Sequence, residues 1–255
     1  MRGTGATGSV MGRGLLALLC WLSSGCAGGT ADERAMRLPV ERVPVANGEA
    51  GPSGPADDRG TPIGTFVHTF YWMEFEADYP GPLDTPLRGD NCQPLADVPQ
   101  GFADRLCVEG SGRLQNGALL NLSGPCSCGY QCPETGVAVC LFRAGTEAPA
   151  WGYGSDGNPL VPLRSLAIDE GILPYGTMLY IPEWDGVAMP ASNGLGGFVH
   201  DGCFRVDDIG YGVEGMHYDL YAGTAELWRE LEGLLPTHSS TLVYRDPPRC
   251  ARRRF

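Results

Sequence analysis

Apolar and polar residues alternate with a period of two over residues 65–75, which predicts a β-strand at the start of the folded region. The residues on one face are aromatic apart from one histidine: Phe66, His68, Phe70 and Trp72. The opposite face carries Thr69 and Tyr71. His68 has two interpretations, a catalytic group or a hydrogen-bonded histidine of a half-buried strand, and the second is the commoner arrangement.

Short apolar runs predict further strands along the chain, at residues 118–122, 137–142, 163–168, 177–181 and 240–244. One helix is predicted near the C-terminus. Thr224 is a suitable N-cap, leucines and Trp228 recur at helical spacing after it, and Pro236 ends the pattern. Many short strands with a single helix indicate a mainly β fold of barrel type.

Residues 204–221 contain two alternating segments, which are separated by Gly210, Gly212 and Gly215. The pattern predicts a strand, a turn and a second strand, that is, a hairpin. Asp208 ends the first strand, and Asp219 lies within the second. The hairpin would place the two carboxylates on neighbouring backbone segments. An ordinary hairpin with acidic turn residues is the structural alternative.

Two blocks of this sequence resemble a known family. Asp208-Ile-Gly-Tyr-Gly-Val-Glu-Gly, three residues and then Asp219-Leu-Tyr221 are similar to the signature of the three-aspartate domain. This domain is the catalytic part of the membrane-bound lytic transglycosylase A family. Upstream, Arg164-Ser-Leu-Ala-Ile-Asp169 followed by Pro174-Tyr-Gly-Thr177 resembles a second family block in the expected order.

The resemblance implies that the barrel is a double-psi β-barrel, to which the sequence pattern adds a disulfide-rich insertion and one C-terminal helix. It also implies that Asp219 is the catalytic acid and that Asp208 is a supporting aspartate. The implied reaction cleaves a glycosidic bond with a single carboxyl group, because the 6-hydroxyl of the sugar attacks and a 1,6-anhydro end forms. An aspartate with the ordinary pKa of about 4 is ionised at neutral pH, so Asp219 should be partly buried.

Further site residues are predicted around this pair. The candidates for substrate binding are Tyr221, His217, Tyr71, Thr69 and Asp169. For Tyr218 and Tyr221, which flank Asp219, packing in the barrel core is an equal alternative. Asp201 and Asp207 compete with Asp169 for the role of third aspartate, and Asp169 is also explained as an acidic turn residue. Glu214 stands where the family has a lysine, which replaces a cation by an anion near the site.

The charge balance limits the class of partner. The chain has 18 basic and 30 acidic residues, a net charge of −12 and no lysine, so lysine-dependent chemistry is excluded. Nucleic acid is not expected as a partner, because no basic stripe is present to contact phosphates. The run Arg252–Arg254 is interpreted as a solvated tail. We predict no metal and no cofactor, and we expect a monomer.

The N-terminal residues predict export. Residues 1–26 combine arginines with a short apolar core at 15–22 and end in Leu-Ser-Ser-Gly-Cys26, which resembles a lipobox. Lipid modification of Cys26 and a membrane anchor are therefore predicted, with plain secretion as the alternative. Residues 27–62 are rich in Gly and Pro and predict a flexible tether. The barrel domain is predicted over 63–246, with a cysteine-rich elaboration at 77–150, and a basic tail over 247–255.

Export explains the cysteines. Apart from Cys20 and Cys26, eight cysteines remain, at positions 92, 107, 126, 128, 132, 140, 203 and 250. An even set in an exported chain predicts four disulfides, although the pairing is not determined by the sequence. A zinc site is the alternative for the dense group at 126–140.

Three functions are consistent with these observations. The first is a peptidoglycan lytic transglycosylase of the cell envelope, either lipid-anchored or secreted, that acts on glycan strands. The second is a barrel module that binds cell-wall glycan without cleaving it, because fold alone does not decide function. The third is a hydrolase of another β-1,4-glucan that uses two carboxylates, which would require them to be roughly 6.5–9.5 Å apart.

Overall fold

The computed structural model describes residues 57–145, 147–253 and 255. Its largest element is a closed six-stranded barrel with the strand order β1-β11-β8-β10-β9-β12. Its strands are β1 (Thr61–Trp72), β8 (Ser165–Ile168), β9 (Met178–Ala188), β10 (Val199–Asp208), β11 (His217–Gly223) and β12 (Ser240–Arg245). The pairs β1/β11 and β10/β8 are parallel, and the remaining pairs of the barrel are antiparallel. The predicted fold class, a mainly β protein built on a barrel, is confirmed.

The alternation in β1 explains how this strand packs. Phe66, His68 and Phe70 are buried, whereas Val67 is exposed and Thr69 is half-buried. The ring nitrogens of His68 lie 3.1 Å from the Ser239 carbonyl oxygen and 3.2 Å from that of Leu235. Burial lowers the pKa of His68. Of the two interpretations of this residue, the hydrogen-bonded core histidine is confirmed.

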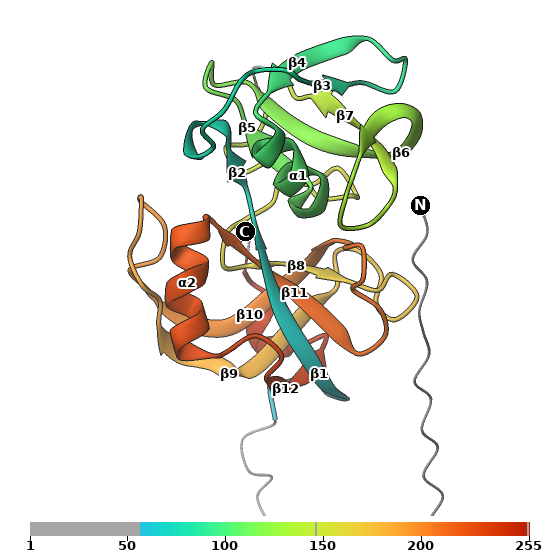
Figure 1. The fold of residues 1–255 in the computed structure, drawn as a ribbon. Coiled ribbons are helices and arrows are strands. Elements are labelled where there is room, and N and C mark those ends of the chain that lie inside the picture. Colours follow the sequence, from blue (N-terminus) through green and yellow to red (C-terminus); the bar gives the residue numbers. More distant parts are fainter. Residues whose placement is uncertain (1–56, 146, 254) are drawn as a thin grey trace, which may run out of the picture. The chain divides into compact units, whose positions relative to one another are not determined.

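The helix predicted after Thr224 is present as α2 (Ala225–Leu234). The Thr224 side chain accepts a hydrogen bond from the Leu227 amide at 3.2 Å, as expected of an N-cap. Leu227 and Leu231 are fully buried in the barrel core, because one face of the helix packs against the barrel (Figure 1).

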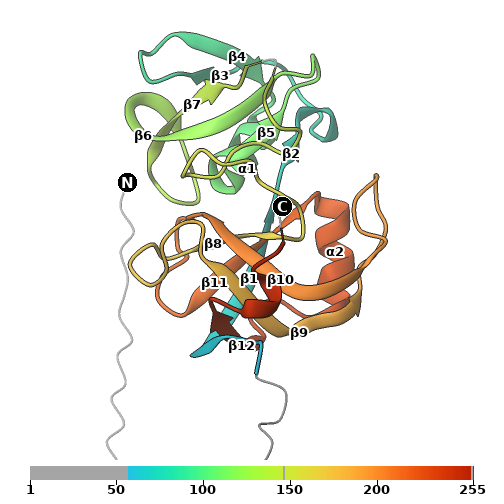
Figure 2. The ribbon, with the colours of Figure 1, turned by 180° about the vertical axis from the view of Figure 1, so that it is seen from behind.

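A second group of elements, here called the lobe, lies between β1 and β8 in the sequence and has its own core (Figures 1 and 2). It contains a four-stranded sheet, a two-stranded sheet, a 3₁₀ turn at Glu76–Asp78 and one α-helix. Its elements are β2 (Glu74–Phe75), β3 (Thr85–Arg88), β4 (Pro94–Val98), α1 (Gln100–Glu109), β5 (Ser111–Arg113), β6 (Leu119–Gln131) and β7 (Ala138–Arg143). The strands predicted at 118–122 and 137–142 correspond to β6 and β7.

Helix α1 is a correction to the prediction of a single helix. Phe102 and Leu106, four residues apart, are both buried, and Gly110 ends the helix with a φ of 81°. This spacing is visible in the sequence, but the surrounding cysteines, glycines and prolines indicated cross-linked loops.

The predicted hairpin at 204–221 is also wrong in its pairing. Strands β10 and β11 are not neighbours, because β8 lies between them and pairs with both. The glycine-rich segment 209–216 therefore passes from one side of β8 to the other, instead of forming a tight turn.

All eight cysteines form disulfides, so the disulfide interpretation is confirmed. Three of the bonds lie within the lobe and one in the barrel: Cys92–Cys128, Cys107–Cys132, Cys126–Cys140 and Cys203–Cys250. The sulfur atoms of Cys126, Cys128 and Cys140 lie within 4.8 Å of one another, but each is already bonded in a disulfide. Disulfides are typical of oxidising compartments and therefore support export.

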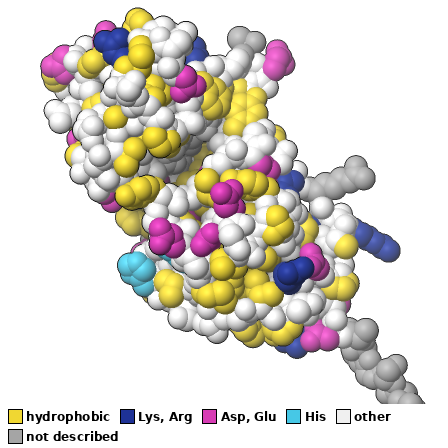
Figure 3. Space-filling view, turned by 90° about the vertical axis from the view of Figure 1, so that its right-hand side faces the viewer, with side chains coloured by type: hydrophobic (Ala, Val, Ile, Leu, Met, Phe, Trp, Pro, Cys, Tyr) yellow, Lys and Arg dark blue, Asp and Glu magenta, His cyan; other side chains and the backbone are white. Residues whose placement is uncertain are grey.

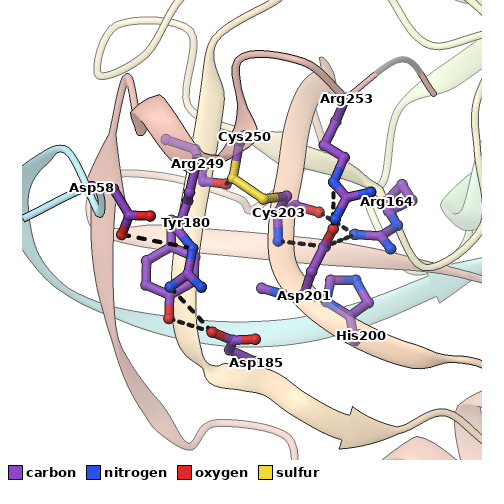
Figure 4. The surroundings of a disulfide bond; sticks show 12 residues. Asp58, Arg164, Tyr180, Asp185, His200, Asp201, Cys203, Arg249, Cys250 and Arg253 are labelled. Atoms are coloured by element: carbon purple, nitrogen blue, oxygen red, sulfur yellow. Dashed lines mark hydrogen bonds and ion pairs between the residues drawn. A yellow bond between two sulfur atoms is a disulfide. The ribbon is translucent and has the colours of Figure 1, made fainter.

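The C-terminal segment is fastened to the barrel by a disulfide and ion pairs, while Arg252 and Arg253 remain exposed. Cys250, in the 3₁₀ turn Pro248–Cys250, is bonded to Cys203 of β10 (Figure 4). Arg253 forms an ion pair of 2.7 Å with Asp201, and Arg249 forms one of 3.1 Å with Asp185.

The N-terminal predictions, which include the signal peptide and Cys26, lie outside the described residues. Within the described part of the chain, none of the helices has the length and apolar character needed to cross a bilayer.

We predict that Cys203→Ser/Cys250→Ser lowers the free energy of unfolding by about 2–4 kcal/mol, because the bond closes a large loop of the unfolded chain. The sequence separation of 47 residues makes this loop the longest of the four. Denaturant unfolding of the oxidised protein measures the change. An unchanged midpoint and slope would show that the C-terminal segment does not support the barrel.

Candidate active site

The two predicted catalytic aspartates occupy one row across the barrel sheet. Asp208 of β10 pairs with Ala167 of β8, and Asp219 of β11 pairs with the same Ala167. Thr69 of β1 extends the row, because it pairs with Asp219. The Cα atoms of the aspartates are thus separated by two strand spacings, roughly 10 Å. The residue between the two aspartates in this row is Ala167, whose side chain is small.

Asp219 is the less satisfied carboxyl group of the pair. Its Oδ1 atom is buried and has no hydrogen-bond partner among the described residues. Burial raises the pKa of Asp219 to about 7, and the charge of Asp208 acts in the same direction, whereas the hydroxyl of Thr69 opposes the rise. A carboxylic acid with this pKa retains its proton in much of the population near neutral pH.

Asp208 has the opposite surroundings. Its Oδ1 atom accepts hydrogen bonds from the Ser155 amide (2.9 Å), the Ser155 hydroxyl (2.5 Å) and the Ile209 amide (2.9 Å). Its Oδ2 atom accepts one from the Tyr71 hydroxyl at 3.1 Å. Burial raises the pKa of Asp208, but these four donors oppose the rise because they stabilise the ionised form. Asp208 is therefore suited to hold a negative charge beside Asp219.

Close packing of a loop against β10 places Ser155 at this position. A Cβ atom on Gly154 would lie 2.0 Å from the carbonyl oxygen of Asp207, so only glycine fits there. The side chain of Asn121 holds the neighbouring Tyr153 backbone with two hydrogen bonds, of 3.0 and 3.3 Å. The loop thus connects β6 of the lobe with Asp208 of the barrel.

Both aspartates line a pocket of about 210 Å³ that is formed by the barrel and the lobe together. Its barrel side includes Tyr71, Ala167 and the start of the 209–216 segment. The lining from the lobe and the loop after it was not predicted as part of the site: Cys107, Val108, Glu109, Gly110, Ser111, Asn121, Leu122, Phe142, Tyr153, Gly154 and Ser155. These residues form no motif in the sequence that would indicate a site, because only the tertiary fold brings them together.

The predicted binding residues lie at different depths. Tyr71 lines the pocket. Thr69 and His217 are half-buried beside Asp219, with 2.8 Å between the Thr69 hydroxyl and the His217 Nε2 atom. Tyr221 is fully buried, packs 4.8 Å from the Tyr71 ring, and donates a hydrogen bond to the Trp151 carbonyl at 2.9 Å. Its side chain thus supports Tyr71 and is not part of the pocket lining.

The three candidates for the third aspartate have different hydrogen-bond and ion-pair partners in the structure. Asp169 accepts hydrogen bonds from the amides of Gly171 and Gly215, both at 2.8 Å, and so fastens the 209–216 segment. Asp207 is buried and bonded to Ser165 and Arg205, and Asp201 is paired with Arg164 and Arg253. None of the three lines the pocket. Exposed Glu214 does not line it either.

Comparison with known proteins identifies the fold. No family model matches the sequence, and no curated protein matches it. Solved structures do match. The structure of Escherichia coli MltA with bound chitohexaose aligns with 72% of this chain and 72% of that chain, at 16% sequence identity and a TM-score of 0.51.

The fold is that of MltA. A second E. coli MltA structure, described as a lytic transglycosylase fold, covers 71% of this chain and 70% of that chain, with 16% identity and a TM-score of 0.40. The structure of a membrane-bound lytic murein transglycosylase from Agrobacterium tumefaciens aligns with 74% of this chain and 75% of that chain, with 14% identity and a TM-score of 0.43. The fold assignment rests on the first structure. The predicted resemblance to the MltA family is thus confirmed for the fold.

We predict that the stability of the wild-type protein decreases, relative to Asp219→Asn, as the pH rises from about 4 to about 7. The pKa of Asp219 rises from 3.8 in the unfolded chain to about 7 in the folded protein, so folding becomes less favourable as this group ionises. Urea unfolding at several pH values measures the difference between the two proteins. A constant difference over this range would contradict the raised pKa.

We also predict that Gly154→Ala lowers the free energy of unfolding by about 1–3 kcal/mol, because the added Cβ forces the loop away from β10. Gly145→Ala is the matched control, since a Cβ there would meet no atom within 4 Å. Equal stability of the two variants would show that the loop does not depend on this close contact.

Proposed function

We propose that this protein is a peptidoglycan lytic transglycosylase of the bacterial cell envelope, with Asp219 as its only proton carrier. The single observation on which the proposal depends is the contrast between the two aspartates. Asp208 has donors on both carboxylate oxygens, whereas Asp219 lines the pocket with a raised pKa and has a buried Oδ1 atom without a partner among the described residues. The MltA fold supports this choice of reaction.

In the first step, Asp219 donates its proton to the glycosidic oxygen between N-acetylmuramic acid and N-acetylglucosamine, and the bond from this oxygen to C1 of the muramic acid breaks. In the second step, the Asp219 carboxylate accepts the proton of the muramic acid 6-hydroxyl, and the oxygen of this hydroxyl bonds to C1 of the same sugar. The products are a 1,6-anhydro end and a free 4-hydroxyl, and Asp219 regains its proton. The same carboxyl group therefore acts first as acid and then as base.

Asp208 has a supporting role in this reaction. Its negative charge lies in the same row as Asp219 and raises the pKa of that group, which keeps the acid protonated. Hydrolysis by two carboxylates would require Asp208 to activate a water molecule. Four donors already occupy its two oxygens, close to the full capacity of a carboxylate. The geometry thus favours transglycosylation over hydrolysis.

The remaining predictions on partners and location belong to the same proposal. The partner is the glycan strand of peptidoglycan, without nucleic acid, metal or cofactor, and the protein acts as a monomer. The exported chain is held in the envelope through Cys26 or is secreted.

Digestion of purified sacculi with wild-type protein and Asp219→Asn tests the proposed activity, with products identified by mass spectrometry. We predict 1,6-anhydromuropeptides from the wild type and a loss of about 10²–10⁴-fold in the variant. Asp208→Asn should retain more activity and shift the pH optimum downwards, because the pKa of Asp219 falls. Reducing ends as products would indicate a hydrolase, and binding to sacculi without any product would indicate a glycan-binding module.

A further inference from the structure

The described residues that line the pocket have only acidic or neutral side chains. The lining contains three carboxyl groups, Asp208 and Asp219 from the barrel and Glu109 from the lobe. Among the described residues, no arginine and no histidine lines the pocket, and the whole chain contains no lysine. An anionic group of a ligand would therefore lose its hydration in this pocket without gaining a cationic partner.

The nearest arginine to Glu109 does not change this balance. Arg105 forms ion pairs with Glu109 and, at 3.7 Å, with Glu74, and its guanidinium lies 5.6 Å from the centre of the Trp72 ring. Burial raises the pKa of Glu109 to about 8, with a contribution from the charge of Asp219, while Trp72 and Arg105 oppose the rise. Additional negative charge in the pocket would thus be unfavourable.

Neutral polar and apolar groups dominate the remainder of the lining. Ser111 is 1% exposed, and its buried hydroxyl has no hydrogen-bond partner in the described part of the chain. Tyr211, Ile209 and Phe142 line the same pocket but are 77%, 41% and 38% exposed. Figure 3 shows one face of the molecule, on which acidic side chains are more frequent than basic ones.

These groups match the chemistry of an uncharged sugar. A pyranose ring presents an apolar C–H face, which packs on aromatic and aliphatic side chains, and hydroxyl or acetamido groups, which bind neutral donors and acceptors. Tyr211 belongs to the 209–216 segment of the barrel and Phe142 belongs to the lobe, so they can contact different parts of a bound glycan. Because both side chains are already exposed, a glycan can contact them without any rearrangement of the core.

We propose that this pocket selects uncharged sugar residues, and that Tyr211 and Phe142 contact the sugar rings. The proposal takes from the proposed function only the class of ligand, a β-1,4-linked N-acetylated glycan. In peptidoglycan the lactyl carboxyl group of muramic acid is uncharged where it is amide-linked to a peptide, and anionic where the peptide has been removed. Strands with free lactyl carboxylates should therefore bind more weakly than strands in which these groups are amides.

The test compares two forms of one ligand. Peptide-free strands of alternating N-acetylglucosamine and N-acetylmuramic acid are used with free carboxylates, and again after conversion of the carboxylates to primary amides. Calorimetry with Asp219→Asn, which prevents cleavage, measures both affinities at neutral pH and low salt. We expect the amidated strands to bind at least about tenfold more tightly, with a smaller ratio at high salt. Equal or tighter binding of the carboxylate form, or binding of neither form, would overturn the proposal.

Variants at the pocket mouth sharpen the test. In the same background, Ile209→Arg should selectively increase affinity for the carboxylate form, because it adds a cation at the pocket. Leu83→Arg is the matched control, since Leu83 is 58% exposed and does not line the pocket. Tyr211→Ala should weaken binding of the amidated strands roughly fivefold, whereas Tyr211→Phe retains the ring and should bind as before. An equal response to both arginine substitutions, or unchanged binding by Tyr211→Ala, would contradict the proposal.

The outcome separates this inference from the proposed activity. Preferential binding of amidated strands together with a failure of the wild type to form 1,6-anhydro ends would contradict the activity and support the charge selection. Formation of these ends without any preference between the strands would support the activity and contradict the charge selection.

Discussion

The chemistry of this protein depends on the unequal hydrogen bonding of two aspartates in one row of a barrel. Asp208 and Asp219 flank Ala167, so their carboxyl groups lie on the same side of the sheet. Four donors stabilise the charge of Asp208, whereas Asp219 is half-buried and its buried Oδ1 atom has no partner among the described residues. Burial raises the pKa of Asp219, and the charge of Asp208 acts in the same direction. Two identical side chains thus have different surroundings, and the roles that we propose for them follow from this difference.

The lobe contributes to this difference although it contains neither aspartate. Ser155, in the loop that follows the lobe, donates two of the four hydrogen bonds to Asp208, and Gly154 makes the required approach possible. Glu109 connects the lobe to the barrel, because it accepts a hydrogen bond of 3.0 Å from the amide of Trp72. The three disulfides of the lobe constrain a region with a small hydrophobic core of its own. The lobe therefore supplies part of the pocket lining and also supports the hydrogen bonds to Asp208.

Much of the barrel could be predicted from the sequence, since strand alternation and the cap of α2 are local signals. The pairing of strands is not local. Asp208 and Asp219 were predicted to lie near each other in a hairpin, but they are near each other because each pairs with β8. The motif that contains Ala167 predicted a strand, yet its position between the aspartates follows only from the closed barrel. Similarly, Ser155 and Ser111 carry no motif, and the fold alone brings them to the pocket.

The most direct test of this account is the titration of the carboxyl carbons of Asp219 and Asp208 by ¹³C NMR in the wild-type protein, with Asp219→Asn and Asp208→Asn used for assignment. The account predicts that Asp219 titrates near pH 7, which is its expected pKa, and that Asp208 titrates at lower pH. Titration of Asp219 near the ordinary aspartate value of 3.8, or of Asp208 above Asp219, would contradict it.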